Sequence, residues 1–280
     1  MRVQAYVAPA LLLPVLYLVG CGSGSPPGQT TDPTQSPYTF SGEWGAQLAP
    51  TISPASASIE AFLGTLSASN GIVIGSLIAL PNSAVIGVAC TTPSATPIAV
   101  TGTVDSSGNL TITLPVAGGT ATLTAALSTN PETEATGSYK IVGGTCAMPP
   151  TAMQIAQYAP LNGTYTGTFN EYNSSGQPVA GTVSAITAIL AQSITPNSND
   201  QYPVTGMVTV TGACTATFTL SNSIVWGGVL EASDPSFSYT FGGASDPTAT
   251  TLQSFFISEN SSASCPFTYN QVFIGVLARQ

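Results

Sequence analysis

Apolar and hydroxyl side chains alternate along several short segments of this chain, and this alternation constrains the fold more than any other feature. It is clearest in LTITL (residues 110–114), ATLTAAL (121–127) and FSYTF (237–241). Successive side chains of a β-strand point to opposite faces, so a period of two predicts strands with one buried face and one hydroxyl-bearing face. The segment QVFIGVLA (271–278) is apolar on both faces, which predicts a central or closing strand.

Turn residues separate these segments. The chain contains 28 glycines and 22 prolines, and DSSGN (residues 105–109) has the composition of a hairpin turn. Charged residues make up only 5% of the chain, so its surface must be built largely from Ser, Thr, Asn, Gln and Gly. No second long apolar run follows the first 20 residues. We therefore predict an all-β exported protein.

The chain contains an internal repeat. YTFSGEWGAQL (residues 38–48) and APLNGTYTGTF (159–169) each place a glycine two residues before a large aromatic, Trp44 in the first and Tyr165 in the second. A Val-x-Gly triplet and then a cysteine follow in both copies. Each copy has room for seven or eight strands. The expected fold is two tandem antiparallel β domains, each a small barrel or a two-sheet sandwich.

Two further matches extend the repeat. The Val-x-Gly triplets lie at 73–75 and 204–206, and the segment 100–114 corresponds to 225–241, each with a strand, a turn and an alternating strand. The predicted organisation is a signal peptide (1–20), a flexible linker (21–37), a first β domain (38–150) and a second β domain (159–280).

Cysteine positions agree with this division. Apart from Cys21, the chain has Cys90, Cys146, Cys214 and Cys265, and four cysteines allow three pairings. Disulfides are expected outside the cytoplasm, and the repeat favours one bond in each copy, Cys90–Cys146 and Cys214–Cys265. The chain has no histidine and its cysteines are widely spaced. We therefore expect no metal site and no cofactor.

The start of the chain predicts export. One basic residue is followed by the apolar run VAPALLLPVLYLV (residues 7–19), which has the features of a secretory signal peptide. This run is too short, and too interrupted by proline, for a membrane-spanning helix of roughly 20 apolar residues. The following GSGSPPGQTTDPTQSP (22–37) has no aliphatic side chain and predicts a flexible tether.

Leu18, Val19 and Gly20 precede Cys21, and this motif resembles the lipobox of bacterial lipoproteins. The resemblance implies that the Cys21 thiol carries a diacylglycerol, that cleavage occurs before Cys21, and that the new amine carries a fatty acid such as palmitate. The membrane is then a partner through this anchor. Gly22, in place of aspartate, favours the outer membrane of the bacterial envelope.

Two broader resemblances concern the folded part. Gly42 and Trp44 resemble the Gly-x-Trp opening of lipocalin-type and avidin-type barrels, in which the tryptophan closes one end. The whole chain resembles tandem-β lipoproteins of soil bacteria such as acidobacteria, which combine a lipobox, a Pro/Thr/Ser linker and a late Gly-Gly-x-Cys, here residues 143–146. The second copy departs from that pattern with SSASC (261–265). This second resemblance implies fold and location, without an activity.

Residues for catalysis are scarce. Without histidine, imidazole-based triads are excluded. Ser138 and Lys140 are expected to share a strand face, which is more typical of a solvated lysine than of a catalytic pair. Glu43 and Glu171 neighbour the opening aromatics and could line the mouth of a pocket. We expect no catalytic residue.

Function follows from these features only in outline. Lys140 and Arg279 are the basic residues left after the signal, against 12 acidic residues, so no basic footprint for nucleic acid exists. The leading hypothesis is a membrane-anchored envelope lipoprotein with a non-enzymatic structural, adhesive or interaction role. One alternative is a lipocalin-like barrel that binds an apolar or glycan ligand through Trp44, Tyr165 or Trp226. A carboxylate-based enzyme acting on glycans is a third.

Overall fold

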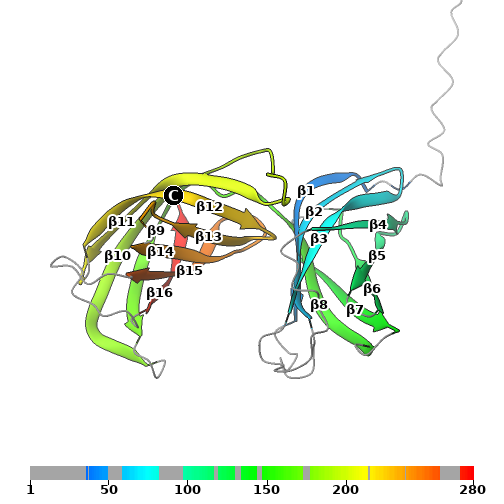
Figure 1. Cartoon of the computed structure of the whole chain (residues 1–280), viewed down its shortest axis with the longest axis horizontal. Coiled ribbons are helices and arrows are strands. Elements are labelled where there is room, and N and C mark those ends of the chain that lie inside the picture. Colours follow the sequence, from blue (N-terminus) through cyan, green and yellow to red (C-terminus); the bar gives the residue numbers. More distant parts are fainter. Residues whose placement is uncertain are drawn as a thin grey trace, which may run out of the picture. The chain divides into compact units, whose positions relative to one another are not determined.

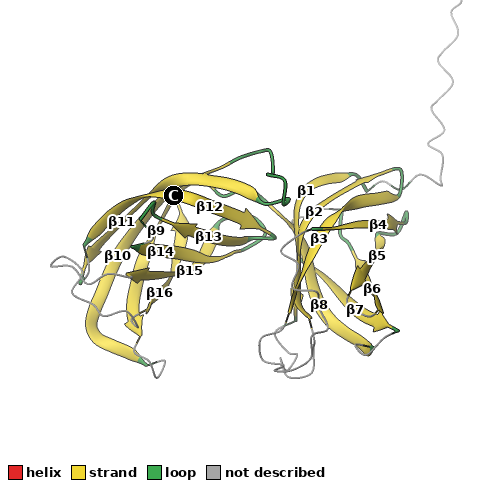
Figure 2. Cartoon of the chain, viewed as in Figure 1, coloured by secondary structure: helices red, strands yellow, loops and turns green. Residues whose placement is uncertain are grey.

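The computed structural model describes residues 36, 38–49, 59–81, 97–116, 119–129, 134–143, 147–172, 177–213, 215–236, 238–258 and 272–280. All of these lie within one compact unit, Thr34–Gln280. Their regular structure is strand throughout (Figure 2). Within these ranges, no helix is long and apolar enough to cross a membrane.

The first half of the compact unit is a closed antiparallel barrel in which each strand pairs with its neighbours in sequence and β1 pairs with β8 (Figure 1). Its strands are β1 (Phe40–Leu48), β2 (Ile59–Ser69), β3 (Ile72–Pro81), β4 (Ile98–Val104), β5 (Asn109–Val116), β6 (Gly119–Ala126), β7 (Ala135–Val142) and β8 (Met148–Tyr158). The predicted end of the first domain, residue 150, falls inside β8, so the boundary belongs eight residues further along, after Tyr158.

The second half is a second closed barrel of the same topology, in which β16 pairs with β9. Its strands are β9 (Asn162–Tyr172), β10 (Pro178–Gln192), β11 (Tyr202–Gly212), β12 (Ala216–Trp226), β13 (Val229–Ser233), β14 (Tyr239–Ser245), β15 (Thr251–Ser258) and β16 (Val272–Arg279). The predictions of an all-β fold and of two tandem antiparallel domains are confirmed, and the barrel alternative is the correct one. The strand predicted at 271–278 is, over its described residues, β16, which closes the second barrel.

Strand register confirms the internal repeat over the first three strands of each barrel. In both, a glycine of the first strand faces a leucine of the second, and that leucine faces the Val-x-Gly glycine of the third. The two series are Gly42–Leu66–Gly75 and Gly163–Leu190–Gly206.

The predicted correspondence between residues 100–114 and 225–241 is wrong by one strand. Residues 100–114 cover β4, its turn and β5, whereas residues 225–241 cover the end of β12, all of β13 and the start of β14. By strand order, the counterpart of the 105–109 turn is the short Gly227–Gly228 turn between β12 and β13. Similar turn composition misaligned the two copies, because the second barrel has another turn, with Asp234, one strand later.

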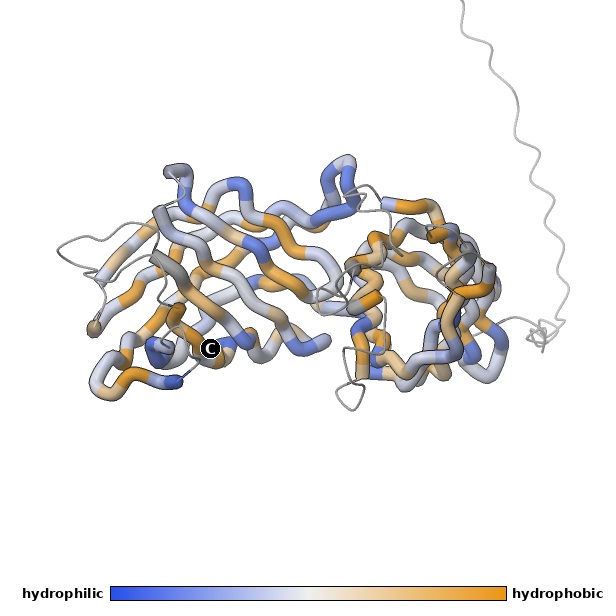
Figure 3. Tube along the Cα trace, turned by 60° about the horizontal axis from the view of Figure 1, so that its bottom comes forward, coloured by the Kyte–Doolittle hydropathy of each residue, from blue (hydrophilic) through white to orange (hydrophobic). Residues whose placement is uncertain are grey.

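Side-chain alternation builds each core. Leu110, Ile112 and Leu114 are buried inside the first barrel, as the period of two predicts. Figure 3 shows apolar and polar positions alternating along the strands. An eight-stranded barrel encloses a space that side chains can just fill. Aromatic rings occupy much of it here: Phe40, Trp44, Phe62 and Tyr139 in the first core, and Tyr165, Phe169, Phe218, Phe241, Phe256 and Phe273 in the second.

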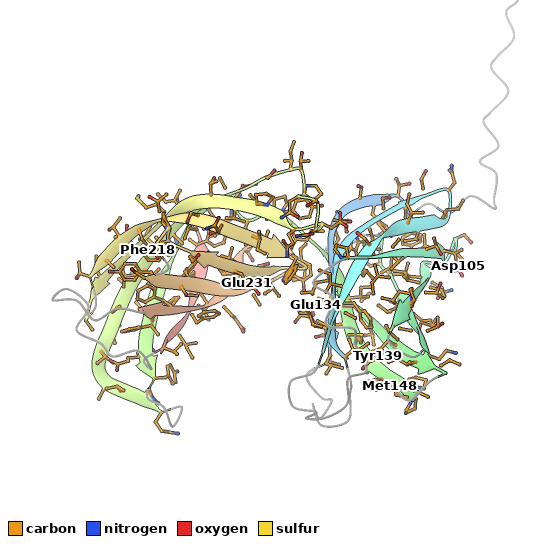
Figure 4. The ribbon with its side chains drawn as sticks, viewed as in Figure 1. Asp105, Glu134, Tyr139, Met148, Phe218 and Glu231 are labelled. Carbon is orange, nitrogen blue, oxygen red and sulfur yellow. The ribbon has the colours of Figure 1, made fainter. Side chains whose placement is uncertain are left out.

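The predicted turn at 105–109 is confirmed. It joins β4 to β5 and begins at Asp105 (Figure 4). The Asp105 carboxylate accepts backbone N–H bonds from Ser107 at 2.8 Å and Asn109 at 2.9 Å. Gly108 has φ +86°, a conformation that glycine adopts without strain. The aspartate therefore satisfies the backbone donors that the tight turn frees.

The Tyr139 hydroxyl of β7 bonds to the backbone at the start of β2, across the inside of the first barrel. This contact gives a prediction about stability. This fully buried hydroxyl accepts the Ile59 N–H and donates to the Ile59 carbonyl, both at 3.1 Å. The register partner of Ile59 is Pro81, which has no N–H to offer. Tyr139→Phe should therefore lower the free energy of unfolding by about 1–3 kcal/mol, measured by urea denaturation.

Tyr38→Phe is the matched control. The Tyr38 hydroxyl donates a longer bond, 3.3 Å, to the Leu127 carbonyl at a half-buried position. Its loss should lower the free energy of unfolding by less than about 1 kcal/mol. Equal effects of the two substitutions would contradict a special role for Tyr139.

All four cysteines lie outside the described residues, so the two disulfides stay a prediction. In sequence, Cys90 falls between β3 and β4, and Cys146 between β7 and β8; Cys214 and Cys265 fall in the equivalent connections of the second barrel. In an up-and-down barrel these two connections leave from the same end. Non-reducing peptide mapping should find Cys90–Cys146 and Cys214–Cys265, each stabilising its barrel by roughly 4 kcal/mol. A Cys90–Cys214 crosslink would contradict the pairing.

Candidate functional site

Two of the three aromatic residues predicted to bind a ligand are core residues, one in each barrel. Trp44 is 1% exposed and packs against Phe40, with ring centroids 4.6 Å apart. Tyr165 is fully buried in the second barrel, where its hydroxyl donates to the Ala249 carbonyl at 2.9 Å. Trp226 is half-buried at the end of β12. The positions of Trp44 and Tyr165 indicate packing rather than ligand contact.

Other candidates from the sequence are not brought together. Cys21 lies outside the described residues. Lys140 is exposed, and the nearby Ser138 hydroxyl bonds with the Thr124 hydroxyl at 3.2 Å. Glu171 is buried in β9 of the second barrel, whereas Glu43 belongs to β1 of the first. Glu43 bonds to Gln192, which lies beside Asn162 at the start of β9. Glu171 lies nine residues further along that strand, roughly 30 Å from Asn162, so the two glutamates do not form the carboxylate pair that a glycan-cleaving enzyme requires.

Glu43 is one of two buried glutamates in the part of the chain that the structure describes. It is 3% exposed, yet it lies on the outer face of β1, because the neighbouring Trp44 points into the core. Residues of the second barrel cover it. Its Oε1 accepts the Gly228 N–H at 2.7 Å, and its Oε2 accepts an N–H of the Gln192 side chain at 2.8 Å. A carboxylate of the first barrel thus forms hydrogen bonds with two parts of the second, the turn after β12 and the end of β10.

Glycines allow the second barrel to approach Glu43 closely. Gly227 and Gly228 form the turn between β12 and β13, with φ of +52° and +79°. A Cβ on Gly228 would lie 2.2 Å from a ring carbon of Tyr158, and a Cβ on Gly45 would lie 2.7 Å from the Gly227 carbonyl oxygen. Any larger side chain at these positions would push the turn away and break the Gly228 bond to Glu43.

Gln192, at the end of β10, is fixed on both sides. Its Oε1 accepts the Leu161 N–H at 2.7 Å, and its own backbone N–H donates to Asn162 Oδ1 at 2.9 Å. Because the amide oxygen is taken by Leu161, the NH₂ group must face Glu43. The residues that follow β8 and open β9 thereby orient the side chain that binds the carboxylate.

Burial makes Glu43 a weaker acid than a glutamate exposed to water. Loss of hydration raises its pKa to about 7, and the bonds from Gly228 and Gln192 offset part of this effect. Burial, and then the charges of Glu134 and Glu43, raise the pKa of Tyr158 to about 12. The pKa of Tyr202 is raised by burial and then by Glu43 and Asp200. The charges that act on these two tyrosines are therefore negative.

A cleft of about 790 Å³ adjoins Glu43 and is lined by residues of both barrels. Much of its wall is apolar or aromatic: Ile74, Tyr158, Pro160, Ile194, Pro196 and Tyr202. Gln157 also lines it, and the buried Oε1 of this side chain has no hydrogen-bond partner within the described chain. The arrangement combines an apolar wall with two side chains, Glu43 and Gln157, that accept hydrogen bonds.

Sequence reasoning singled out Glu43 but placed it at a pocket mouth, and it missed Gln192, Gln157 and Gly228. The Gly-Gly pair after Trp226 was the available signal, since two consecutive glycines mark a tight turn or a close approach. In the part of the chain that the structure describes, no group of three or more Cys, Asp or Glu residues could hold a metal ion.

Comparison with known proteins adds no family. No protein-family model matches the chain, and no curated protein matches it significantly.

The raised pKa of Glu43 predicts a pH dependence. In the unfolded chain the group titrates near 4.5, and in the folded chain at about 7. Between these values the unfolded state gives up the proton while the folded state keeps it, so stability falls as pH rises. The free energy of unfolding should drop by about 3 kcal/mol between pH 4.5 and pH 7 and level off above that.

Urea denaturation of Glu43→Gln across this pH range tests the assignment. The variant should lose the pH-dependent component, whatever its stability at one pH, because the amide does not titrate. Glu231→Gln, the same change at an exposed position of β13, should follow the parent chain. If the profiles of Glu43→Gln and the parent chain run parallel, the assignment is wrong.

Proposed function

We propose that this chain is a lipid-anchored protein of the bacterial cell envelope, and that its two barrels form a non-enzymatic body with a structural, adhesive or interaction role. The observation that carries the proposal is the order of segments at the N-terminus. An apolar run ends in Leu18-Val19-Gly20-Cys21, and a Gly/Ser/Pro/Thr tether separates that cysteine from the first barrel.

Membrane energetics support this reading of Cys21. Each buried CH₂ of an acyl chain contributes about 0.8 kcal/mol, so one chain binds only marginally and two or three anchor stably. A lipobox cysteine receives a diacylglycerol on sulfur and an acyl group on nitrogen, which makes three chains. The tether that follows has the composition of a flexible spacer.

The barrels suit a contact surface better than a reaction chamber. Their interiors hold large aromatic and aliphatic side chains. Their outer walls carry rows of hydroxyl groups that face each other across strands, such as Thr101 opposite Thr113 and Thr111 opposite Thr124. Such walls form hydrogen bonds with protein or glycan surfaces without strong electrostatic selectivity.

A second candidate function is the binding of a small ligand. The cleft beside Glu43 favours it, since its volume of about 790 Å³ and its apolar wall with a few polar groups are typical of ligand pockets. This position differs from the barrel mouth that the sequence predicted, because Trp44 and Tyr165 are packed into the cores.

Replacing the lipidated residue tests the first proposal. In a bacterial host, Cys21→Ser should move the protein from the membrane fraction to the soluble envelope fraction, because serine lacks the thiol that receives the diacylglycerol. The intact mass of the parent chain should correspond to a start at residue 21 plus acyl groups. Ser23→Ala, two residues away in the tether, is the control and should stay in the membrane fraction. A Cys21→Ser protein that remains membrane-bound would refute the anchor.

A further inference from the structure

We propose that the cleft beside Glu43 binds a small organic amine, with its ammonium group near Glu43 and Gln157 and its apolar body against Ile74 and Ile194. This inference rests on the second candidate function, ligand binding in the cleft. It is independent of the lipid anchor.

The polar groups of the cleft require a ligand that donates hydrogen bonds. The amide NH₂ of Gln157 is already used, since Nε2 donates to the Ser41 carbonyl at 2.8 Å, and its buried Oε1 is left without a partner. Each oxygen of Glu43 accepts one bond and has a further lone pair. An ammonium group carries three donors and no acceptor, so it matches these groups.

The charges around the cleft favour a cation. Glu43 is buried with two neutral donors, and no Lys or Arg stands among the described residues that line the cleft. The Ser76 hydroxyl donates to the Asp200 carboxylate nearby, which adds a second negative charge. A buried carboxylate without a counter-ion is costly, and a bound ammonium would supply one.

The apolar wall of the cleft explains why the amine should carry an apolar body. Ile74 is 55% exposed and Ile194 is 90% exposed, although both are large aliphatic side chains. Exposed apolar side chains gathered at one place mark a binding surface. The rings of Tyr158 and Tyr202 also line the cleft, and aromatic faces attract organic cations.

Three matched probes test the ligand class: 4-phenylbutylamine, 4-phenylbutan-1-ol and 4-phenylbutyrate. They share the same apolar body and differ in the charge and donors of the head group. The chain carrying Cys21→Ser is the starting protein, so that neither lipid nor detergent competes. By isothermal titration calorimetry at pH 8, the amine should bind with a Kd of about 0.1–1 mM. The alcohol should bind at least about tenfold more weakly, and the carboxylate should not saturate.

Variants locate the binding. Glu43→Gln should weaken the amine about tenfold or more and leave the alcohol nearly unchanged, because only the charge is lost. Glu231→Gln, with the same loss of charge at an exposed position outside the cleft lining, should leave both affinities unchanged. Ile194→Ser, at a position too exposed to affect folding, should weaken the amine and the alcohol alike.

The pH dependence gives an independent measure. The ionisable groups that face Glu43 are Tyr158 of β8 and Tyr202 of β11, and both have raised pKa values, so they stay neutral between pH 6 and pH 8. The pKa of Tyr158 is also raised by Glu134 and Asp246, and that of Tyr202 by Asp200. The amine remains protonated in this range. Its affinity should therefore fall about tenfold from pH 8 to pH 6, and should be flat in Glu43→Gln.

The outcomes separate the two proposals. If the alcohol binds as tightly as the amine and Ile194→Ser weakens both, the cleft is a ligand site but the amine assignment is wrong. If no probe saturates up to about 10 mM, both the amine assignment and ligand binding in the cleft are refuted. Tight binding of the carboxylate would also overturn the role of Glu43. None of these results bears on the anchor at Cys21.

Discussion

Closure of each sheet onto itself is the constraint on which the rest of this structure depends. An open β-sheet exposes unpaired backbone groups at its edges, and natural proteins protect such edges with charged residues, above all lysine. This chain has one lysine, Lys140, and 5% charged residues, so it lacks that protection. Pairing of β1 with β8 and of β9 with β16 removes the edges altogether. The uncharged, hydroxyl-rich surface is therefore compatible with a stable body only because both sheets are closed.

The contact between the barrels through Glu43 contributes to specificity more than to stability. A buried carboxylate with neutral donors contributes little to stability, since the loss of hydration offsets most of the hydrogen-bond gain. Such a contact instead favours one arrangement of the two barrels over others. The Gly228 and Gln192 donors fix one register between the turn at the end of β12 and the outer face of β1. The same lack of a counter-ion that weakens this contact at neutral pH makes the neighbouring cleft attractive to a cation.

Much of the fold could be predicted from the sequence, because the signals are local. The alternation at 110–114 gave the strand faces, the composition of 105–109 gave the turn, and the repeated glycine, aromatic and Val-x-Gly positions gave two domains. The choice of barrel over sandwich could not be made, since it depends on pairing between strands more than 100 residues apart, such as Glu43 with Tyr158. The donors to Glu43 were missed for the same reason, as Gly228 lies 185 residues away in the chain.

The repeat shows where the two copies differ in sequence at the contact through Glu43. The glycine of the opening strand has the same register in both, but the residues that follow differ: Glu43 and Gly45 in the first barrel stand where the second has Thr164 and Thr166. The connection after the fourth strand is DSSGN in the first barrel and the short Gly227–Gly228 turn in the second. Each copy therefore departs from the common pattern at the side that meets the other. Both departures therefore coincide at one buried carboxylate, where the absence of side chains on Gly45, Gly227 and Gly228 lets the two barrels approach closely enough for the Glu43 bonds to form.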